Sequence, residues 1–386
     1  MNDYFIALSV ITIGCAFGAW LACRFRQPVI LGYFLCGVVC GPYGLDVIGR
    51  LTFLSHLSRV GVTLLLFLAG MVLHPNRLQK HFSAAMTVTL SGCFLSWILV
   101  FLILSFSGVS PVESDYAALA LMFSSTILVV KLLPTTTLHQ LRMGSLCIAI
   151  LIAQDIIAVI VLLFLRVGGD HSIWYWCLSL PVKTIGLTAA LIAGEQHLLR
   201  PMMRKSDRFN EVLIMLCLAW CLGGALAADA LDLPSEVGAF IAGLSIARGK
   251  IALYLTEQLK PLRDFFLMFF FFVLGARFTV APSAGIIIPA AILTVGILVL
   301  RPLVMAVLFR ATGEEPPFAR ESGIRLGQAS EFALIIAAAA LAHNRISADV
   351  AGIVQIVTIL TMLVSSYIVV FRYPTPIGVQ DRLHRD

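Results

Sequence analysis

Charged residues are scarce in this sequence. Asp, Glu, Lys and Arg make up only 12% of its 386 residues, whereas hydrophobic residues make up 60%. A soluble protein of this length carries about twice that share of charged residues. The composition therefore predicts an all-α polytopic membrane protein. The net charge of +6 is modest and does not indicate a nucleic-acid partner.

The motifs of several functional classes are also missing. The sequence has no G-x-x-x-x-G-K-[ST] loop for ATP, no repeated arginine ladder of a voltage sensor and no potassium-channel filter. Its first apolar run lacks a preceding basic segment and a clear small-residue cleavage site, so we expect a retained helix. What remains is a transporter driven by a second ion gradient, not an enzyme.

Cysteine pairs do not complete a metal site. Cys36 and Cys40, and likewise Cys217 and Cys221, are spaced one helical turn apart inside apolar runs. No His or further Cys completes either set, so we interpret them as small core residues. We therefore expect no cofactor; the only metal would be a transported monovalent cation.

Apolar runs fill most of the chain, and a membrane span needs about 20 such residues. Lys and Arg recur in alternate loops, which predicts an outside amino terminus and a cytoplasmic carboxyl terminus in the inner membrane. About thirteen spans are expected, at 4–23, 28–44, 54–73, 83–107, 115–133, 144–166, 173–199, 210–229, 232–247, 261–280, 284–310, 320–342 and 349–371.

Two of these spans are expected to be discontinuous helices. Irregular backbone persists at membrane depth only where protein or a water-filled cavity covers it. Because the breaks fall in corresponding places, residues 1–166 and 210–371 are expected to be six-helix repeats of inverted topology, joined by a helix at 173–199. The polar residues at the breaks are Ser124, Ser125, Thr126 and Lys131 in the first, and Gln328, Ser330 and Glu331 in the second.

The span at 144–166 carries Gln154 and Asp155 near its middle. A charged side chain at that depth costs at least about 2.5–3.5 kcal/mol, so a carboxylate there predicts a site for a cation or a proton. Hydroxyls of Ser125 and Thr126 are suitable hard ligands for an alkali cation. Gln154 either lends a carbonyl oxygen or braces neighbouring helices. The alternative for Asp155 is a satisfied polar residue packed between helices.

Arg301 lies inside the apolar segment VGILVLRPLVMAVLF. We expect a partnered charge in the core rather than a side chain that reaches an interface, with Asp155 or the carbonyl end of a broken helix as its partner. Glu331 is expected to balance charge at a half-helix end, paired with Arg325 or Lys131.

Six segments spread over most of the chain resemble the cation:proton antiporter 2 family, in particular the membrane domain of Kef-type potassium efflux transporters. They are GVTLLLFLAGMVLHPNRL (61–78), SSTILVVKLL (124–133), AQDIIAVI (153–160), VGAFIAGLSIA (237–247), LRDFFLMFFFFVLGARF (262–278) and GQASEFALII (327–336).

The resemblance implies a sodium/proton antiporter-like fold of thirteen helices, with a mobile core, a scaffold that forms a homodimer, and an elevator-like movement. It implies that Asp155 is the shared cation and proton site, and the Gln-Asp form is associated with potassium. Arg301 falls where the family places a Lys or Arg.

Two features depart from the family pattern. The family's GGEF segment reads ASEF here, at 329–332. No nucleotide-binding regulatory domain is expected in the short tail at 372–386; either the protein lacks that control or the chain is a truncated form. A separate regulatory subunit is a candidate partner. Sodium/proton exchange, a gated cation channel, a ligand-sensing membrane protein and a membrane scaffold remain as alternatives.

Overall fold

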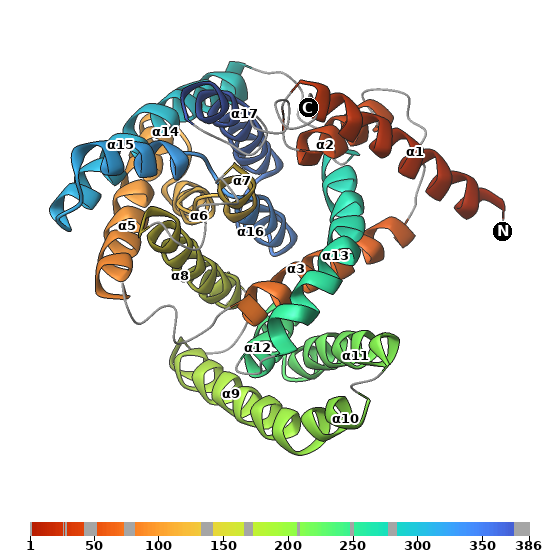
Figure 1. Cartoon of the computed structure of the whole chain (residues 1–386). Coiled ribbons are helices and arrows are strands. Elements are labelled where there is room, and N and C mark those ends of the chain that lie inside the picture. The colour runs from red at the N-terminus through yellow and green to blue at the C-terminus, as the bar shows by residue number, and fades with distance from the viewer. Residues whose placement is uncertain are drawn as a thin grey trace, which may run out of the picture. The chain divides into compact units, whose positions relative to one another are not determined.

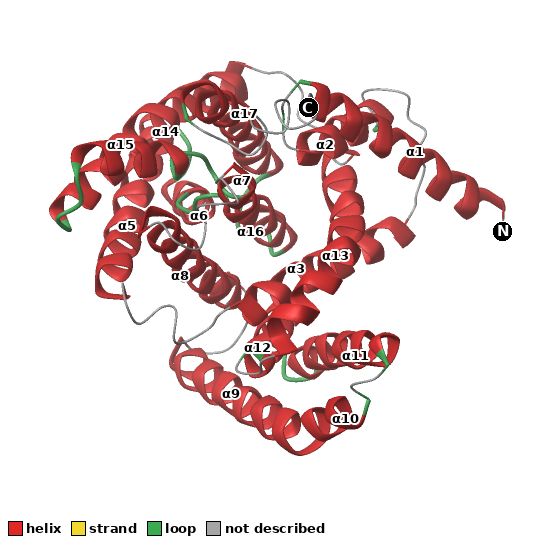
Figure 2. Ribbon diagram, viewed as in Figure 1, coloured by secondary structure: helices red, strands yellow, loops and turns green. Residues whose placement is uncertain are grey.

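The computed structural model describes residues 2–25, 27, 29–41, 52–72, 82–132, 142–165, 173–206, 209–247, 251–276 and 284–373. Within these ranges the chain forms helices joined by turns and short loops, as Figure 2 shows. The one β-type pairing among them is an isolated antiparallel bridge between Ser124 and Ala329.

Each expected span contains a helix, or two half-helices at each of the two expected breaks. The bounds are α1 (Asn2–Arg24), α2 (Val29–Cys40), α3 (Thr52–Val72), α5 (Phe82–Phe106), α6 (Pro111–Leu121), α7 (Thr126–Leu132), α8 (Arg142–Leu165), α9 (Ile173–Gly194), the π-helical turn η2 (Glu195–Leu199), α10 (Arg200–Lys205), α11 (Asn210–Asp229), α12 (Ser235–Ile246), α13 (Ile251–Ala276), α14 (Ala284–Ala311), α15 (Pro316–Arg325), α16 (Glu331–Ala342) and α17 (Ala348–Arg372).

Six helices of the described part are long and apolar enough to cross a membrane. Large apolar side chains remain exposed on them, among them Phe17, Phe94 and Val295. Lipid is a suitable surrounding for such faces, because helices satisfy their own backbone hydrogen bonds. The chain is a multi-pass membrane protein, and the count of thirteen spans stays a prediction.

The chain divides into two compact units, and each combines segments far apart in sequence. The second unit comprises residues 37–79 and 162–277, and in it α3 packs against α12 and α13. Glycines allow these helices to approach closely: a Cβ at Gly70 would lie 2.2 Å from the backbone oxygen of Phe240. The aromatic side chains of Phe67 and Phe271 fill the resulting core and are fully buried.

The first unit comprises residues 1–36, 80–161 and 278–386. In this unit α14 packs against α5, α15 and α17, while α16 packs against α6 and α17 (Figure 1). A Cβ at Gly323 would lie 2.5 Å from the oxygen of Pro302, so only a glycine lets α15 approach α14 this closely. Both broken helices belong to this unit. It also contains α8 up to residue 161, the helix that carries Gln154 and Asp155.

Candidate functional site

The two helix breaks lie side by side inside the first unit. Helix α6 ends at Leu121 and α7 begins at Thr126, whereas α15 ends at Arg325 and α16 begins at Glu331. Between these ends the chain is not helical, and Ser124 pairs with Ala329 in an antiparallel bridge. The expected discontinuities are therefore present, and each supplies the other with backbone partners.

The first break is held by side chains from two other helices, α8 and α16, and by the backbone of Leu326. The backbone N–H of Ser124 donates to Oε1 of Gln154 at 2.9 Å, and its hydroxyl donates to the carbonyl oxygen of Leu326 at 2.8 Å. The hydroxyl of Ser125 donates to Oε2 of Glu331 at 2.7 Å and accepts the N–H of Leu128 at 3.1 Å. These bonds satisfy the polar groups that the break exposes.

The side chain of Asp155, a residue of α8, lies beside the start of the half-helix α7. The hydroxyl of Thr126 is 3.1 Å from Oδ1 and 3.4 Å from Oδ2 of Asp155, and it donates to the carboxylate. Asp155 is 6% exposed, and α7 points its amino-terminal end, with its partial positive charge, toward this region. The structure thus brings Asp155 and Thr126 together, and their role in holding a cation or a proton stays a prediction.

The second break is held by α17, which the sequence analysis did not include in the site. Thr361 accepts the N–H of Ala329 at 3.2 Å, and the hydroxyl of Ser365 donates to Oε1 of Gln328 at 3.1 Å. Thr358, Thr361 and Ser365 recur at helical spacing within the last apolar span. This polar face within an apolar run is the feature of the sequence that could have predicted the contact of α17 with the break.

Ser330 explains why this break tolerates the sequence ASEF. Its φ of −91° and ψ of 154° are extended values that any residue adopts, and its hydroxyl accepts the N–H of Phe332 at 3.2 Å. Ser330 is thus the N-cap of α16, a position that serine favours. The missing glycines impose no backbone strain at this position.

Arg301 contacts the carbonyl ends of the breaks. Nη1 lies 3.2 Å from the oxygen of Phe123 and 3.1 Å from that of Gln328, and Nη2 donates to the oxygen of Leu121. Nε donates to the hydroxyl of Ser96 on α5 at 3.2 Å. Arg301 is 1% exposed, so it is a core residue as expected.

Of the two partners expected for Arg301, the carbonyl end of a broken helix is found and Asp155 is not. No ion pair between Arg301 and Asp155 occurs among the described residues, and the guanidinium donors are directed to the carboxyl-terminal end of α6 and to Gln328. The physical reason is that three clustered carbonyl oxygens match a planar fork with several donors better than one more distant carboxylate does.

Glu331 and Lys131 were the other residues expected to compensate charge in the core. Glu331 is 1% exposed and accepts the hydroxyl of Ser125. Arg325, expected as a partner of Glu331, forms an ion pair with Glu321 at 2.7 Å. The side chain of Lys131 lies outside the described residues.

A family comparison places the chain among known proteins. The family model described as "Sodium/hydrogen exchanger, transmembrane" matches residues 10–371, which is most of the chain. The chain belongs to the sodium/hydrogen exchanger family. Members of this family are monovalent cation:proton antiporters rather than enzymes, and the ions that they exchange are substrates, not cofactors.

Solved structures show the same fold. The structure of the sodium proton antiporter MjNhaP1 from Methanocaldococcus jannaschii at pH 8 is similar with a TM-score of 0.67 and 16% identity, covering 99% of this chain and 98% of that one. A structure of the same antiporter from an electron-microscopy map gives a TM-score of 0.67 and 15% identity, with 98% and 97% coverage. At such low identity the likeness shows the fold alone.

Proposed function

We propose that this protein exchanges potassium for protons across the cell inner membrane, with Asp155 as the site that both ions share. The observation that carries the proposal is the buried carboxylate of Asp155 beside the hydroxyl of Thr126, at the start of a half-helix. One carboxylate holds a proton or a monovalent cation, but not both. This competition couples the two movements.

The oxygen atoms around Asp155 have different roles in this proposal. The hydroxyl of Thr126 has lone pairs and can turn from donor to cation ligand when the proton leaves. The hydroxyl of Ser125 and the carbonyl of Gln154 already bond to Glu331 and to the N–H of Ser124. We therefore assign the cation to Asp155 and Thr126, and the supporting framework to Ser125 and Gln154.

The choice of potassium rests on the Gln154-Asp155 pair, which resembles the Gln-Asp form of Kef-type transporters. Sodium is the alternative, since the matched family takes its name from sodium. Cation choice depends on the number of ligands and the size of the cavity.

Movement and assembly belong to the same proposal. A homodimer would anchor one part of each chain while the part that carries the broken helices moves in an elevator-like step. The thirteen-span arrangement, with inverted repeats at 1–166 and 210–371, an outside amino terminus and a cytoplasmic carboxyl terminus, is part of this proposal. The proposal also includes a separate regulatory subunit as a partner.

The decisive experiment measures exchange in proteoliposomes that contain a pH-sensitive dye, with potassium, sodium and lithium supplied in turn. Asp155→Asn should abolish cation-driven proton movement, because an amide neither ionises nor balances a cation's charge. Folding should persist, since the amide oxygen still accepts the hydroxyl of Thr126. Asp349→Asn is the matched control, because Asp349 is an exposed acid of α17.

Each alternative function has its own outcome in this assay. Exchange that persists in Asp155→Asn near the wild-type rate would remove Asp155 from the site. A cation current without proton movement would indicate a channel. If folded wild-type protein moves none of the three cations, the remaining alternatives are a membrane scaffold and a ligand-sensing protein.

A further inference from the structure

We propose that Arg325 is a positioning residue for the cation site and acts by holding the far end of the half-helix α7. The inference rests on the proposed function, because it takes Asp155 as the exchange site. Arg325 lies more than 150 positions after Asp155 in the sequence. It donates to the carboxyl-terminal end of α7, whereas the amino-terminal end of α7 contacts Asp155.

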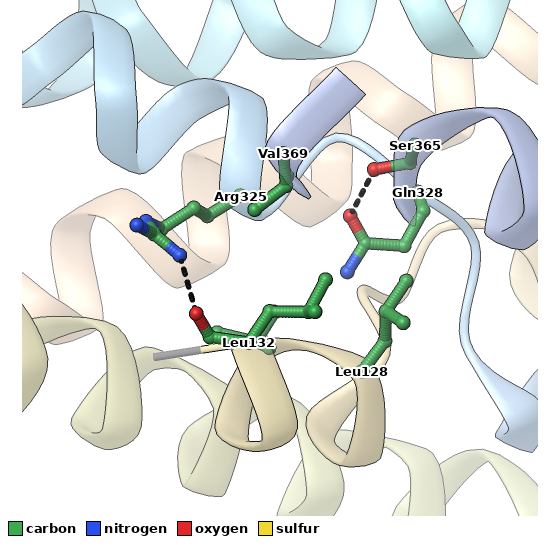
Figure 3. A pocket seen from close by; sticks show the side chains of 7 residues that line it. Leu128, Leu132, Arg325, Gln328, Ser365 and Val369 are labelled. Atoms are coloured by element: carbon green, nitrogen blue, oxygen red, sulfur yellow. Dashed lines mark hydrogen bonds between the residues drawn. The ribbon is translucent and has the colours of Figure 1, made fainter. Parts of the chain in front are cut away.

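Helix α7 connects the two positions. It has only seven residues, from Thr126, which donates to Asp155, to Leu132. Nη1 of Arg325 donates to the carbonyl oxygen of Leu132 at 3.0 Å, as Figure 3 shows. A helix of two turns is too short to form stably on its own, so what holds its ends determines where Thr126 lies.

Arg325 is itself held in place. It is 2% exposed, and Nε and Nη2 donate to Oε1 of Glu321 at 2.9 and 2.7 Å. Its guanidinium carbon lies 5.6 Å from the ring centre of Tyr373, the residue directly after α17, which is within cation–π range. The arginine is thus fixed by α15 and covered by the end of α17.

The arrangement repeats the one at the other half of the broken helix. Arg301 donates to the carbonyls at the end of α6, and Arg325 donates to the carbonyl at the end of α7. A cation at a carboxyl-terminal end stabilises a helix through the partial negative charge there. Each half of the first broken helix therefore has its own arginine.

Leu128 and Leu132 of α7 pack with Val369 of α17 in a buried apolar cluster. The space beside Arg325 has no room for a water molecule and is lined by Leu128 and Leu132 of α7, together with Gln328, Ser365 and Val369. Among the described residues, Nε2 of the fully buried Gln328 has no hydrogen-bond partner, and it is directed toward this space in Figure 3. Apolar contacts are not directional, so the hydrogen bond from Arg325 is a directional contact that fixes the end of α7.

Loss of the bond between Arg325 and Leu132 should change the cation affinity and the pH optimum of exchange. If the bond to Leu132 is lost, α7 is less constrained and Thr126 meets Asp155 for a smaller fraction of the time. The site then loses both a cation ligand and a donor to the charged carboxylate. Cation affinity should fall, and the pH optimum of exchange should move upward, because the proton competes more strongly.

The test compares four variants in the exchange assay, with potassium as the probe and thermal stability measured in parallel. Arg325→Gln should raise the half-saturating potassium concentration about three- to tenfold and move the pH optimum upward. Arg325→Lys should be intermediate, because an ammonium lacks the planar fork that serves Leu132 and Glu321 together. Glu321→Gln should be closer to wild type, since the bond to Leu132 remains.

Arg320→Gln is the matched control, because Arg320 is exposed on the same helix and carries the same charge. A folded Arg325→Gln protein with wild-type affinity and pH optimum would overturn the inference. If that variant does not fold, a folded Arg325→Lys protein indistinguishable from wild type would do so. Wild-type protein that shows no exchange would instead refute the proposed function and would be recognised before any variant is compared.

Discussion

Gln154 and Asp155 are adjacent in sequence but have different partners in the fold. Asp155 accepts the hydroxyl of Thr126, whereas Oε1 of Gln154 accepts the backbone N–H of Ser124 at 2.9 Å. Adjacent helical residues point about 100° apart, which explains why one faces the proposed site and the other the break. Of the two roles that the sequence left open for Gln154, the geometry favours the brace.

This role gives a prediction for Gln154→Leu. The leucine leaves the buried N–H of Ser124 without an acceptor, which costs about 1–3 kcal/mol. Thermal stability should fall, while the ratio of potassium to sodium transport in the remaining folded protein stays near wild type. A variant of unchanged stability with an altered cation preference would make Gln154 a ligand instead.

Sequence reasoning at the residue scale succeeded where the chemistry was local. Asp155 and Thr126 were expected to lie together, because a hydroxyl is a hard oxygen ligand for an alkali cation and a carboxylate supplies the balancing charge. Ser96 and Thr361 were missed, because a single Ser or Thr in an apolar span more often bonds its own helix. Thr361 does both: its hydroxyl also donates to the carbonyl of Thr358 at 3.1 Å.

At the scale of elements, four half-helix ends are matched by charge. The amino-terminal ends of α7 and α16 lie beside Asp155 and Glu331, and the carboxyl-terminal ends of α6 and α7 receive Arg301 and Arg325. Each pairing has the sign that helix dipoles favour. Charged side chains therefore stabilise these four half-helix ends.

Arg301 provides the prediction for this scale. Arg301→Ala removes all donors to Leu121, Phe123 and Gln328 and leaves buried carbonyls unpaired, each at about 1–3 kcal/mol. Thermal unfolding in detergent should show a loss of several kcal/mol, and Arg301→Lys should lose less because it keeps the charge. Arg310→Ala, at an exposed position near the end of the same helix, should change stability little. Equal melting temperatures for Arg301→Ala and Arg310→Ala would contradict this role.

The positions of the helices were more predictable than their ends. Both breaks were expected from polar residues at mid-depth, because such backbone needs cover. The start of α13 was placed at 261, but the helix begins at Ile251 and continues through Pro261. Charged residues such as Glu257 and Lys260 suggested a loop, although their ion pair at 2.6 Å is compatible with an exposed helical face.

At the scale of the whole molecule, the sequence predicted the class of fold but not which segments pack together. The first unit joins residues 1–36, 80–161 and 278–386, and its contacts link positions about 200 apart, such as Arg301 and Leu121. Hydropathy marks an apolar run without saying which partner buries it. Contacts of this range depend on glycine approaches such as Gly323 on Pro302, which no periodicity reveals.

One long-range bond outside the membrane-spanning segments gives the last prediction. Oε1 of Glu113 accepts the N–H of Ser347 at 2.8 Å, and Oε2 accepts the hydroxyl of Ser110 at 2.9 Å. Hydrogen bonds from Ser347 and Ser110 hold the pKa of Glu113 below its ordinary value of 4.5. Because Ser347 is the N-cap of α17, this carboxylate ties the start of α6 to the start of α17.

A lowered pKa means that the folded protein binds the proton of Glu113 less readily than the unfolded chain does. The stabilisation is therefore complete above about pH 4.5 and is lost as the pH falls through the lowered value. Glu113→Gln should reduce stability at neutral pH by less than about 1 kcal/mol, because water screens this exposed group. The difference from wild type should shrink in acid. Thermal unfolding of both proteins from pH 7 to pH 3 measures this difference, and a difference that is independent of pH would mean that the charge of Glu113 does not hold α6 to α17.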